Sequence, residues 1–263
     1  MRMMTRSMIP LLVAGFLLFG AGTFSPHALV FAQASAADSN MHAEILNKAL
    51  KNSKFKDVKV SVQGGMVKLT GTVGVFDTKN QAMQRVQHIK GVKAVENQIQ
   101  VAGPSISDAE LQQKVVKAVQ FDRNGWPSAP FNAVSVSVRN GVVTLGGHAY
   151  GPVDADTAVA TASNIKGVQD VIDNIEVDPV SQMDDHIRMA VYRAVYGFPS
   201  LNKYAIDPLQ PIRISVQHGN VTLYGMVNSQ SDKDTAGIRA NSVSGVFHVT
   251  NDLQVRGQKQ GQK

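Results

Sequence analysis

The segment GMVKLTG at Gly65–Gly71 occurs three times, with small variations, in this 263-residue chain. It returns as GVVTLGG at Gly141–Gly147 and as GNVTLYG at Gly219–Gly225, 76 and then 78 residues further along. Its two glycines, its valine and its leucine keep their places each time. A second motif, Gly91-Val92-x-x-Val95, recurs at the same two intervals. Repetition at constant spacing indicates a chain built from copies of one structural unit.

Apolar and polar residues alternate on both sides of the first glycine. In the first copy Val58, Val60 and Val62 come before it, and Val67 and Leu69 follow. Such alternation is typical of strands with one buried face. The pairs Gly64–Gly65, Asn140–Gly141 and His218–Gly219 between them are typical of two-residue hairpin turns. Each copy is therefore predicted to form a hairpin whose polar side chains face water, namely Lys59, Ser61, Ser135, Ser137, Arg213 and Ser215.

Apolar residues at helical spacing lie before and after each hairpin. Before the first hairpin they are Ile45, Leu46, Ala49 and Leu50. After it, Ala82, Val86 and Ile89 share one helix face, and Gly91 suits a left-handed helix end. A last strand then follows, with Val95, Ile99 and Val101 buried. In the later copies, Ser107 with Glu110, and the acidic pair Asp184 and Asp185, are interpreted as residues that cap the N-termini of the opening helices and complement their helix dipoles.

These patterns predict an α+β fold. Each copy reads as helix, strand, strand, helix, strand, so we expect three tandem αββαβ modules, each a three-stranded sheet with two helices on one face. The first module is expected to span residues 41–101, the second 107–177 and the third 183–255. At 61 to 73 residues, each is long enough to hold a small core of its own.

The repeated unit resembles the BON domain, a family named for bacterial osmotically induced and nodulation proteins. The residues that carry the resemblance are Gly65-x-Val67-x-Leu69-x-Gly71 and Gly91-Val92-x-x-Val95, three times over nearly all of the chain after residue 36. The resemblance implies an exported or envelope-associated protein that binds phospholipid or other envelope components. It implies no enzymatic activity and no cofactor. The shared residues are turn glycines and core valines, so no binding residue is transferred.

The first residues are predicted to be a signal peptide. Arg2 and Arg6 precede the apolar run Ile9–Phe19, and small residues follow Pro26. We place the signal at residues 1–36 and the start of the mature protein near Ala37, with an uncleaved anchor as the alternative. The chain contains no cysteine, so disulfides, cysteine-ligated metals and a cysteine nucleophile are excluded. The expected location is the periplasm or the cell exterior.

No complete sequence motif for catalysis or metal binding occurs in the mature chain, since the two Ser-x-x-Lys strings, at Ser163 and Ser200, lack the companion motifs of penicillin-recognising enzymes. The mature chain also has no G-x-S-x-G, no Walker phosphate loop and no G-x-G-x-x-G. His148 and His218 lie on or beside predicted strands of different modules, without a metal-binding spacing or a carboxylate expected at ligand distance. We interpret them as surface histidines, and we expect no catalytic residues, no metal and no cofactor.

Charge is shared unevenly among the copies. Residues 41–101 hold 10 basic and 4 acidic side chains, whereas residues 102–180 hold 5 and 9. In the first module five lysines gather near the end of the opening helix and the following strand: Lys48, Lys51, Lys54, Lys56 and Lys59. Two interpretations stay open. The lysines either form a contact for anionic membranes or polyanions, or they keep a helix end soluble and balance the acidic second module.

Two insertions distinguish the later copies. The connection from the opening helix to the first strand lengthens to Phe121–Ala133 in the second module and Tyr196–Pro211 in the third. They carry Trp126, Phe131, Phe198 and Tyr204, for which two interpretations stay open. These side chains either fold back over their own core, or they contact another module, a partner or a membrane.

The sequence thus favours a non-enzymatic envelope-binding protein related to osmotic stress. The expected partners are anionic phospholipid surfaces or other envelope components, contacted weakly through several modules. The alternative is a periplasmic stress-related or chaperone-like protein that holds envelope proteins. Nucleic acid is not expected as a partner, because export separates the chain from it and no aromatic residues interleave with the lysines.

Overall fold

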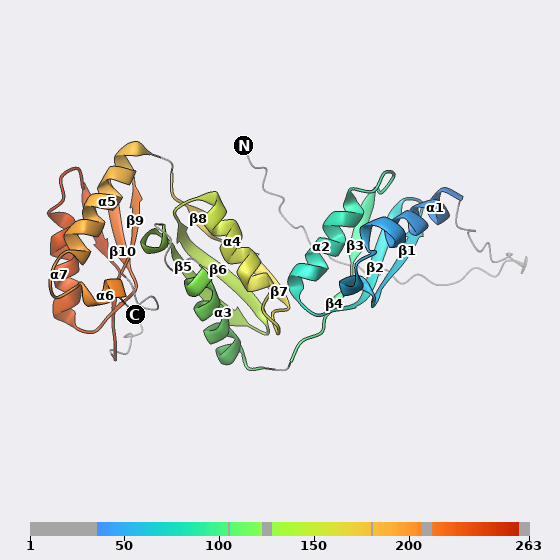
Figure 1. Ribbon diagram of the computed structural model, residues 1–263, viewed down its shortest axis with the longest axis horizontal. Helices are drawn as coiled ribbons and strands as arrows, with labels where there is room; N and C mark the ends of the chain where they lie inside the picture. Colours follow the sequence, from blue (N-terminus) through green and yellow to red (C-terminus); the bar gives the residue numbers. More distant parts are fainter. Residues whose placement is uncertain (1–35, 105, 123–127, 180, 207–211, 258–263) are drawn as a thin grey trace, which may run out of the picture. The chain divides into compact units, whose positions relative to one another are not determined.

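The computed structural model describes residues 36–104, 106–122, 128–179, 181–206 and 212–257 (Figure 1). Residues 1–35 of the predicted signal peptide lie outside the described residues, and so does Trp126. Within the described ranges, no helix has both the length and the apolar character needed to cross a membrane.

The described chain contains three successive copies of one module that mixes helices and strands, so the predicted α+β fold class is confirmed. The first module contains α1 (Ala36–Glu44), the π-helical turn η1 (Ile45–Ala49), the 3-10 turn η2 (Ser53–Phe55), β1 (Val58–Gln63), β2 (Met66–Val73), α2 (Phe76–Gln87), β3 (Ala94–Asn97) and β4 (Gln100–Val101). The second contains α3 (Asp108–Asp122), η3 (Ala129–Phe131), β5 (Ala133–Arg139), β6 (Val142–Ala149), α4 (Pro152–Ser163), β7 (Asp170–Asp173) and β8 (Glu176–Val177). The third contains α5 (Gln182–Tyr196), α6 (Lys203–Ile206), β9 (Arg213–Gln217), β10 (Asn220–Tyr224), β11 (Met226–Val227), α7 (Gln230–Asn241), β12 (His248–Asn251) and β13 (Gln254–Val255).

Each sheet is built around the second strand of the hairpin. In the first module β2 pairs antiparallel with β1, with Val60 opposite Leu69, and parallel with β3 on its other side. The predicted last strand is interrupted, because the Asn97 side chain accepts a hydrogen bond from the backbone of Ile99 and the chain resumes pairing with β2 only at β4. Asp173 and Asn251 do the same in the other modules.

An aspartate near the start of each opening helix holds the hairpin turn of the same module. The Asp108 carboxylate accepts the backbone N–H groups of Asn140 and Gly141, at 2.7 and 2.9 Å. Asp38 holds Gly64 and Gly65 in the same way, and Asp184 holds His218 and Gly219. The residue that caps α5 is Ser181 and not Asp184, whose carboxylate reaches the turn. Asp184 and Asp185 both lie in the first turn of α5, as the helix-dipole interpretation predicts. The Ser107 cap of α3 is as predicted.

The turn residues have the backbone conformation that the sequence indicates. Asn140 and Gly141 both have positive φ, 52° and 74°, as a tight hairpin requires. Gly147, at the far end of β6, also has a positive φ, and a side chain there would strike the carbonyl oxygen of Ala133. The repeated glycines are thus needed for backbone geometry.

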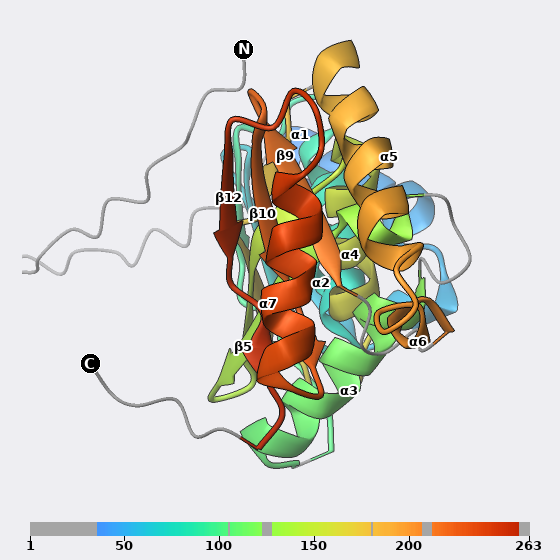
Figure 2. The same cartoon turned by 90° about the vertical axis from the view of Figure 1, so that its left-hand side faces the viewer.

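Both helices of a module pack on the same face of its sheet. Figure 2 shows α5 and α7 on one side of β9, β10 and β12. Between them lie fully buried side chains from helix and strand, including Val191, Ile214, Leu223 and Ala240. The other face of each sheet carries the polar residues of the alternating strands. In the first module the opening helix begins at Ala36, ahead of the expected residue 41, and Ile45 lies in a π-helical turn.

Candidate functional site

The five lysines of the first module all have exposed side chains. Lys48 pairs with Glu44 of α1, at 3.0 Å, and its side chain is 73% exposed. Lys54 donates a hydrogen bond to the neutral side chain of Gln81 in α2 and lies over the Phe55 ring, 5.2 Å from its centre. Of these lysines, only Lys48 meets a carboxylate within the residues that the structure describes.

The lysines do not form a single patch. Lys48 and Lys54 contact α1 and α2, so they lie on the helical side of the module. Lys59 lies on β1 between Val58, which is buried in the core, and the core-packed Val60, so its side chain points to the opposite face of the sheet. The structure therefore separates Lys59 from the lysines that precede β1.

The insertion of the third module folds back onto its own α7. Tyr204 is buried, and its hydroxyl donates to Asp232 at 2.7 Å, while Lys203 reaches the same carboxylate oxygen at 2.8 Å. Burial would raise the pKa of Asp232, but these two hydrogen bonds, a third with Ser229 and the charge of Lys203 together hold the pKa below the ordinary 3.8. Burial raises the pKa of Tyr204, and the bond to Asp232 raises that of Lys203. Phe198 is 36% exposed and lies under the Arg239 guanidinium.

The insertion of the second module contacts both its own helix and the third module. Ser128 and Asn132 donate hydrogen bonds to Asp154 of α4, which occupies the place of Asp232 in the repeat. Phe131, however, packs in the core cluster of the third module, with its ring 6.2 Å from that of Tyr192 in α5. Phe131 therefore lies between two modules, whereas Tyr204 stays within one.

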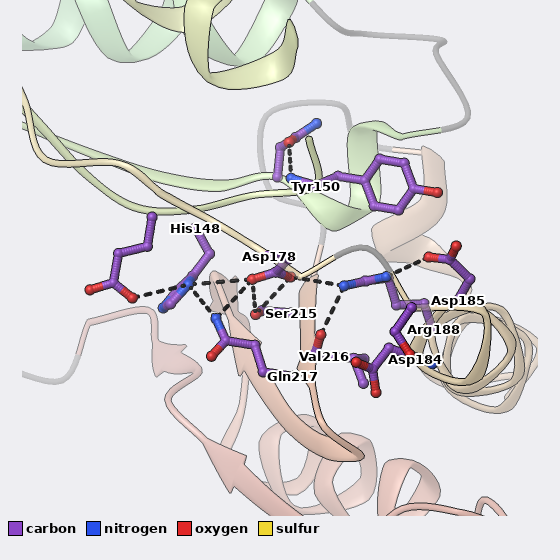
Figure 3. A network of polar contacts seen from close by, with 12 residues as sticks. His148, Tyr150, Asp178, Asp184, Asp185, Arg188, Ser215, Val216 and Gln217 are labelled. Carbon is purple, nitrogen blue, oxygen red and sulfur yellow. Dashed lines mark hydrogen bonds and ion pairs between the residues drawn. The ribbon is translucent and has the colours of Figure 1, made fainter. Parts of the chain in front are cut away.

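A buried polar network joins the second and third modules (Figure 3). At its centre is Asp178, which follows β8 and whose side chain has no exposed surface. Its carboxylate accepts hydrogen bonds from Ser215 and Gln217 of β9, each at 3.0 Å. Arg188 of α5 adds an ion pair at 3.3 Å. The end of one module is thus bound on the sheet of the next.

Arg188 has contacts that fix it in this network. Besides Asp178, its guanidinium contacts the Asp185 carboxylate and donates to the carbonyl oxygen of Val216, at 2.8 Å. The ring of Tyr150 lies 5.1 Å from the guanidinium carbon, a cation–π distance. Only Nε is left without a hydrogen-bond partner among the described side-chain atoms that are buried. A buried pair with this many contacts specifies one way of docking two modules more than it adds stability.

This junction corrects one expectation about exposure. Ser215 was expected to face water, but it is only 3% exposed. Arg213, also expected to face water, is largely covered and donates a hydrogen bond to the carbonyl oxygen of Ala129 in the second module. Burial lowers the pKa of Arg213. Strand alternation assigned both side chains to the correct face, but it gave no sign that another module covers that face.

His148 also differs from its interpretation. Its Nδ1 lies 3.4 Å from Asp178 and 3.9 Å from Glu176, because β6 pairs with β8 and places His148 opposite Glu176. The ring stacks on Tyr224 of the third module. Two carboxylates are therefore close to this histidine. Even so, the described residues contain no cluster of histidine and acidic side chains able to hold a metal ion.

The sequence offered only weak signals for these residues. An aspartate does recur near the start of every opening helix, but the insertions change its distance from the turn, so it does not follow the constant intervals of the glycines. Asp178 fell between the expected bounds of the second and third modules, and Ser215 was interpreted as one more polar strand residue. Neither position shows, without a structure, that its partner lies in another module.

Comparison with known proteins gives a family and two relatives. The model of the BON domain matches residues 38–103, 107–179 and 200–257. The chain is similar to osmotically-inducible protein Y of Escherichia coli (strain K12), with 26% identity over 210 residues, covering 76% of this chain and 98% of that protein. It is also 27% identical over 135 residues to an uncharacterized protein in the gshII 5′ region of Anaplasma centrale, covering 50% of this chain and 89% of that one.

A solved structure with a weaker likeness is the C-terminal domain of CdsD, the structural protein of the type III secretion system of Chlamydia trachomatis. It is 13% identical, covers 81% of this chain and 96% of its own, and has a TM-score of 0.25, which is too low to support any argument. The family model, by contrast, matches three segments that together make up well over half of the sequence, and the three modules of the structure correspond to them. The chain belongs to the BON domain family.

Proposed function

We propose that this chain is an exported, non-enzymatic protein of the bacterial envelope that binds anionic phospholipid surfaces through its first module. The observation that carries the proposal is the exposure of Lys48, Lys51, Lys54 and Lys56. Of these, only Lys48 is paired with a carboxylate within the described residues. Uncompensated cations on a surface attract anionic headgroups by about 1 kcal/mol each.

The charge difference between modules supports this assignment. The first module carries a net charge of +6 over residues 41–101, whereas residues 102–180 carry −4. An anionic surface therefore attracts the first module and repels the second. The similarity to osmotically-inducible protein Y further supports a role under envelope or osmotic stress.

Co-sedimentation with lipid vesicles tests the proposal. The protein covering residues 37–263 is expected to sediment with vesicles containing anionic lipid, to stay in solution with neutral vesicles, and to be released as salt rises. Replacing Lys48, Lys51, Lys54 and Lys56 by glutamine should lower the partition coefficient by about two to three orders of magnitude at low salt. A control variant in which Lys90, Lys93, Lys114 and Lys117 become glutamine removes the same charge from other exposed positions, two in the first module and two in the second. If both variants bind equally well, the location of the contact is wrong.

A second candidate function is the holding of other envelope proteins, and one observation favours it. In the third module, the sheet face opposite the helices already binds a polypeptide segment, the end of the second module at Asp178. Absence of vesicle binding by the full chain would leave this candidate in place and would exclude the first.

A further inference from the structure

The first and third modules carry the same polar triplet on the sheet face opposite their helices, which we call the open face. Strand β9 has Arg213, Ser215 and Gln217 on that face, and the equivalent positions of β1 are Lys59, Ser61 and Gln63. The pattern is a basic residue, a serine and a glutamine at alternate positions. In β5 of the second module the basic residue is at the other end and the glutamine is missing, since the positions hold Ser135, Ser137 and Arg139.

In the third module this triplet binds a carboxylate-bearing segment. Ser215 and Gln217 donate hydrogen bonds to the Asp178 carboxylate, and Arg213 donates to the backbone at Ala129. Ser215 and Gln217, two neutral donors two residues apart on one strand, therefore hold one carboxylate. The neighbouring cation, Arg213, holds the backbone of the docked module. The third module thus shows that a triplet of this kind can bind a carboxylate-bearing segment.

The opening helix of each of these modules also carries a side chain that reaches the edge strand, though at carbonyl oxygens two residues apart in the repeat. Arg188 of α5 donates to the carbonyl oxygen of Val216 in the edge strand and pairs with Asp178. In the first module, His42 of α1 lies within hydrogen-bond distance, 3.2 Å, of the carbonyl oxygen of Val60 in the equivalent edge strand. A side chain able to donate therefore stands beside both triplets.

In the first module the triplet is unoccupied within the residues that the structure describes. Lys59, Ser61 and Gln63 are all exposed, and none of their three side chains has a hydrogen-bond or ion-pair partner among those residues. Lys68 lies opposite Ser61 on β2, where the third module has Thr222, and adds a second cation to this face. Lys68 is paired with Glu96 only at 3.6 Å, and both side chains are about half exposed.

From this correspondence we infer that the open sheet face of the first module, at Lys59, Ser61 and Gln63, is a docking site for an aspartate- or glutamate-bearing segment of another polypeptide. Ser61 and Gln63 hold the carboxylate as Ser215 and Gln217 hold Asp178. Lys59 and Lys68 supply the charge complementarity that favours an acidic occupant. The site lies on the face opposite to that of Lys48 and Lys54, so it does not depend on phospholipid binding.

The third module of a second copy does not fit as the occupant. The residue that follows the last strand is Asp178 in the second module but Arg256 in the third, and both occupy the same place in the repeat, since each donates its backbone N–H to the second hairpin strand or its continuation. Head-to-tail association of copies would therefore bring Arg256 toward Lys59 and Lys68, with like charge and no carboxylate. An acidic segment of a different polypeptide satisfies the donors.

A peptide of this chain's own sequence is the direct probe. Residues 174–182 (NIEVDPVSQ) contain the segment that the third module holds. Fluorescence anisotropy of this labelled peptide with the protein covering residues 37–263 is expected to show saturable, salt-sensitive binding. Removing a hydrogen bond to a charged group should weaken binding about tenfold or more. Both the double variant Ser61→Ala with Gln63→Ala and a peptide with Asp178→Asn are expected to show at least that loss.

Matched controls separate this site from other causes. Ser137→Ala removes the equivalent hydroxyl from the second module and should leave peptide binding unchanged, as should glutamine at Lys48, Lys51, Lys54 and Lys56. Because Ser61 and Gln63 are exposed, their double variant should unfold thermally like the wild type and keep its binding to anionic vesicles. No peptide binding by the wild type, or equal binding by the double variant, would overturn the inference. Vesicle binding lost together with peptide binding would overturn it too, because the two sites would then not be separate.

Discussion

Ser215 of the third module donates its hydroxyl hydrogen bond to Asp178 of the second, 3.0 Å from both carboxylate oxygens, and both side chains are buried. This contact joins two modules of the repeat through polar side chains that are buried between them. Small modules have little apolar surface to bury, so a buried polar contact helps to fix how one module is oriented relative to the next. The docking of the third module on the second therefore depends on Asp178.

Replacing Asp178 by alanine is expected to destabilise the docking of these modules by about 3 kcal/mol. Arg188 would remain buried after losing one partner, while Asp185 and the Val216 carbonyl would still hold it. Calorimetry of the full chain should show the two modules unfolding at a lower temperature and with less cooperativity. Glu176→Ala is the control, because the Glu176 side chain is 74% exposed. Equal melting of the two variants would mean that the network does not hold the modules together.

Removing the carboxylate that holds a hairpin turn should destabilise the module that contains the turn. Asp108→Ala deletes the acceptor of the Asn140 and Gly141 amides and is expected to cost about 1.5–3 kcal/mol of unfolding free energy. Urea denaturation measures this, with the exposed Asp156 of α4 changed to alanine as the charge-matched control. A loss no larger than that of the control would show that the turn forms without Asp108.

Stability at acidic pH should depend on Asp232. Its pKa is held below 3.8 in the folded protein, whereas in the unfolded chain it returns to about that value. The unfolded state therefore binds the proton first, so the stabilising contribution of Asp232 is complete well above pH 3.8 and is lost as the pH falls below it. Urea denaturation at pH 6 and pH 3 should show a smaller decrease for Asp232→Asn than for the wild type. The same decrease in both would contradict the role of the contacts with Lys203 and Tyr204.

Local features of the fold were predictable from the sequence, and contacts between modules were not. The turn glycines and strand valines repeat because backbone geometry and core packing within one module require them, so Gly141 and Leu145 identify their elements without a structure. Ser215 shows the limit, since alternation gives the face of a strand residue but not what covers that face. Asp108 was missed for another reason: its partner turn is close in space, but the insertion between them varies in length from copy to copy.

The same distinction, between local features and contacts over long sequence distances, applies to the candidate site residues. The exposure of Lys48 and Lys54 follows from composition and helix position, and the structure places both on the helical side of the first module. The separate position of Lys59 on the other face follows from strand period. That Phe131 packs with the third module, while Tyr204 stays with its own helix, depends on distances between segments far apart in the chain.

The first module is the proposed contact of this chain with an anionic membrane. Because the sequence has no cysteine, one introduced cysteine can carry an environment-sensitive fluorophore at a chosen exposed position of each module. Suitable positions are Asn47 in the first module, Gln113 in the second and Ser231 in the third. On addition of anionic vesicles, the probe at 47 is expected to shift to the blue and to be quenched by lipid-borne quencher, with reversal at high salt, while the probes at 113 and 231 stay unchanged. No response at 47, or an equal response at all three positions, would contradict this proposal.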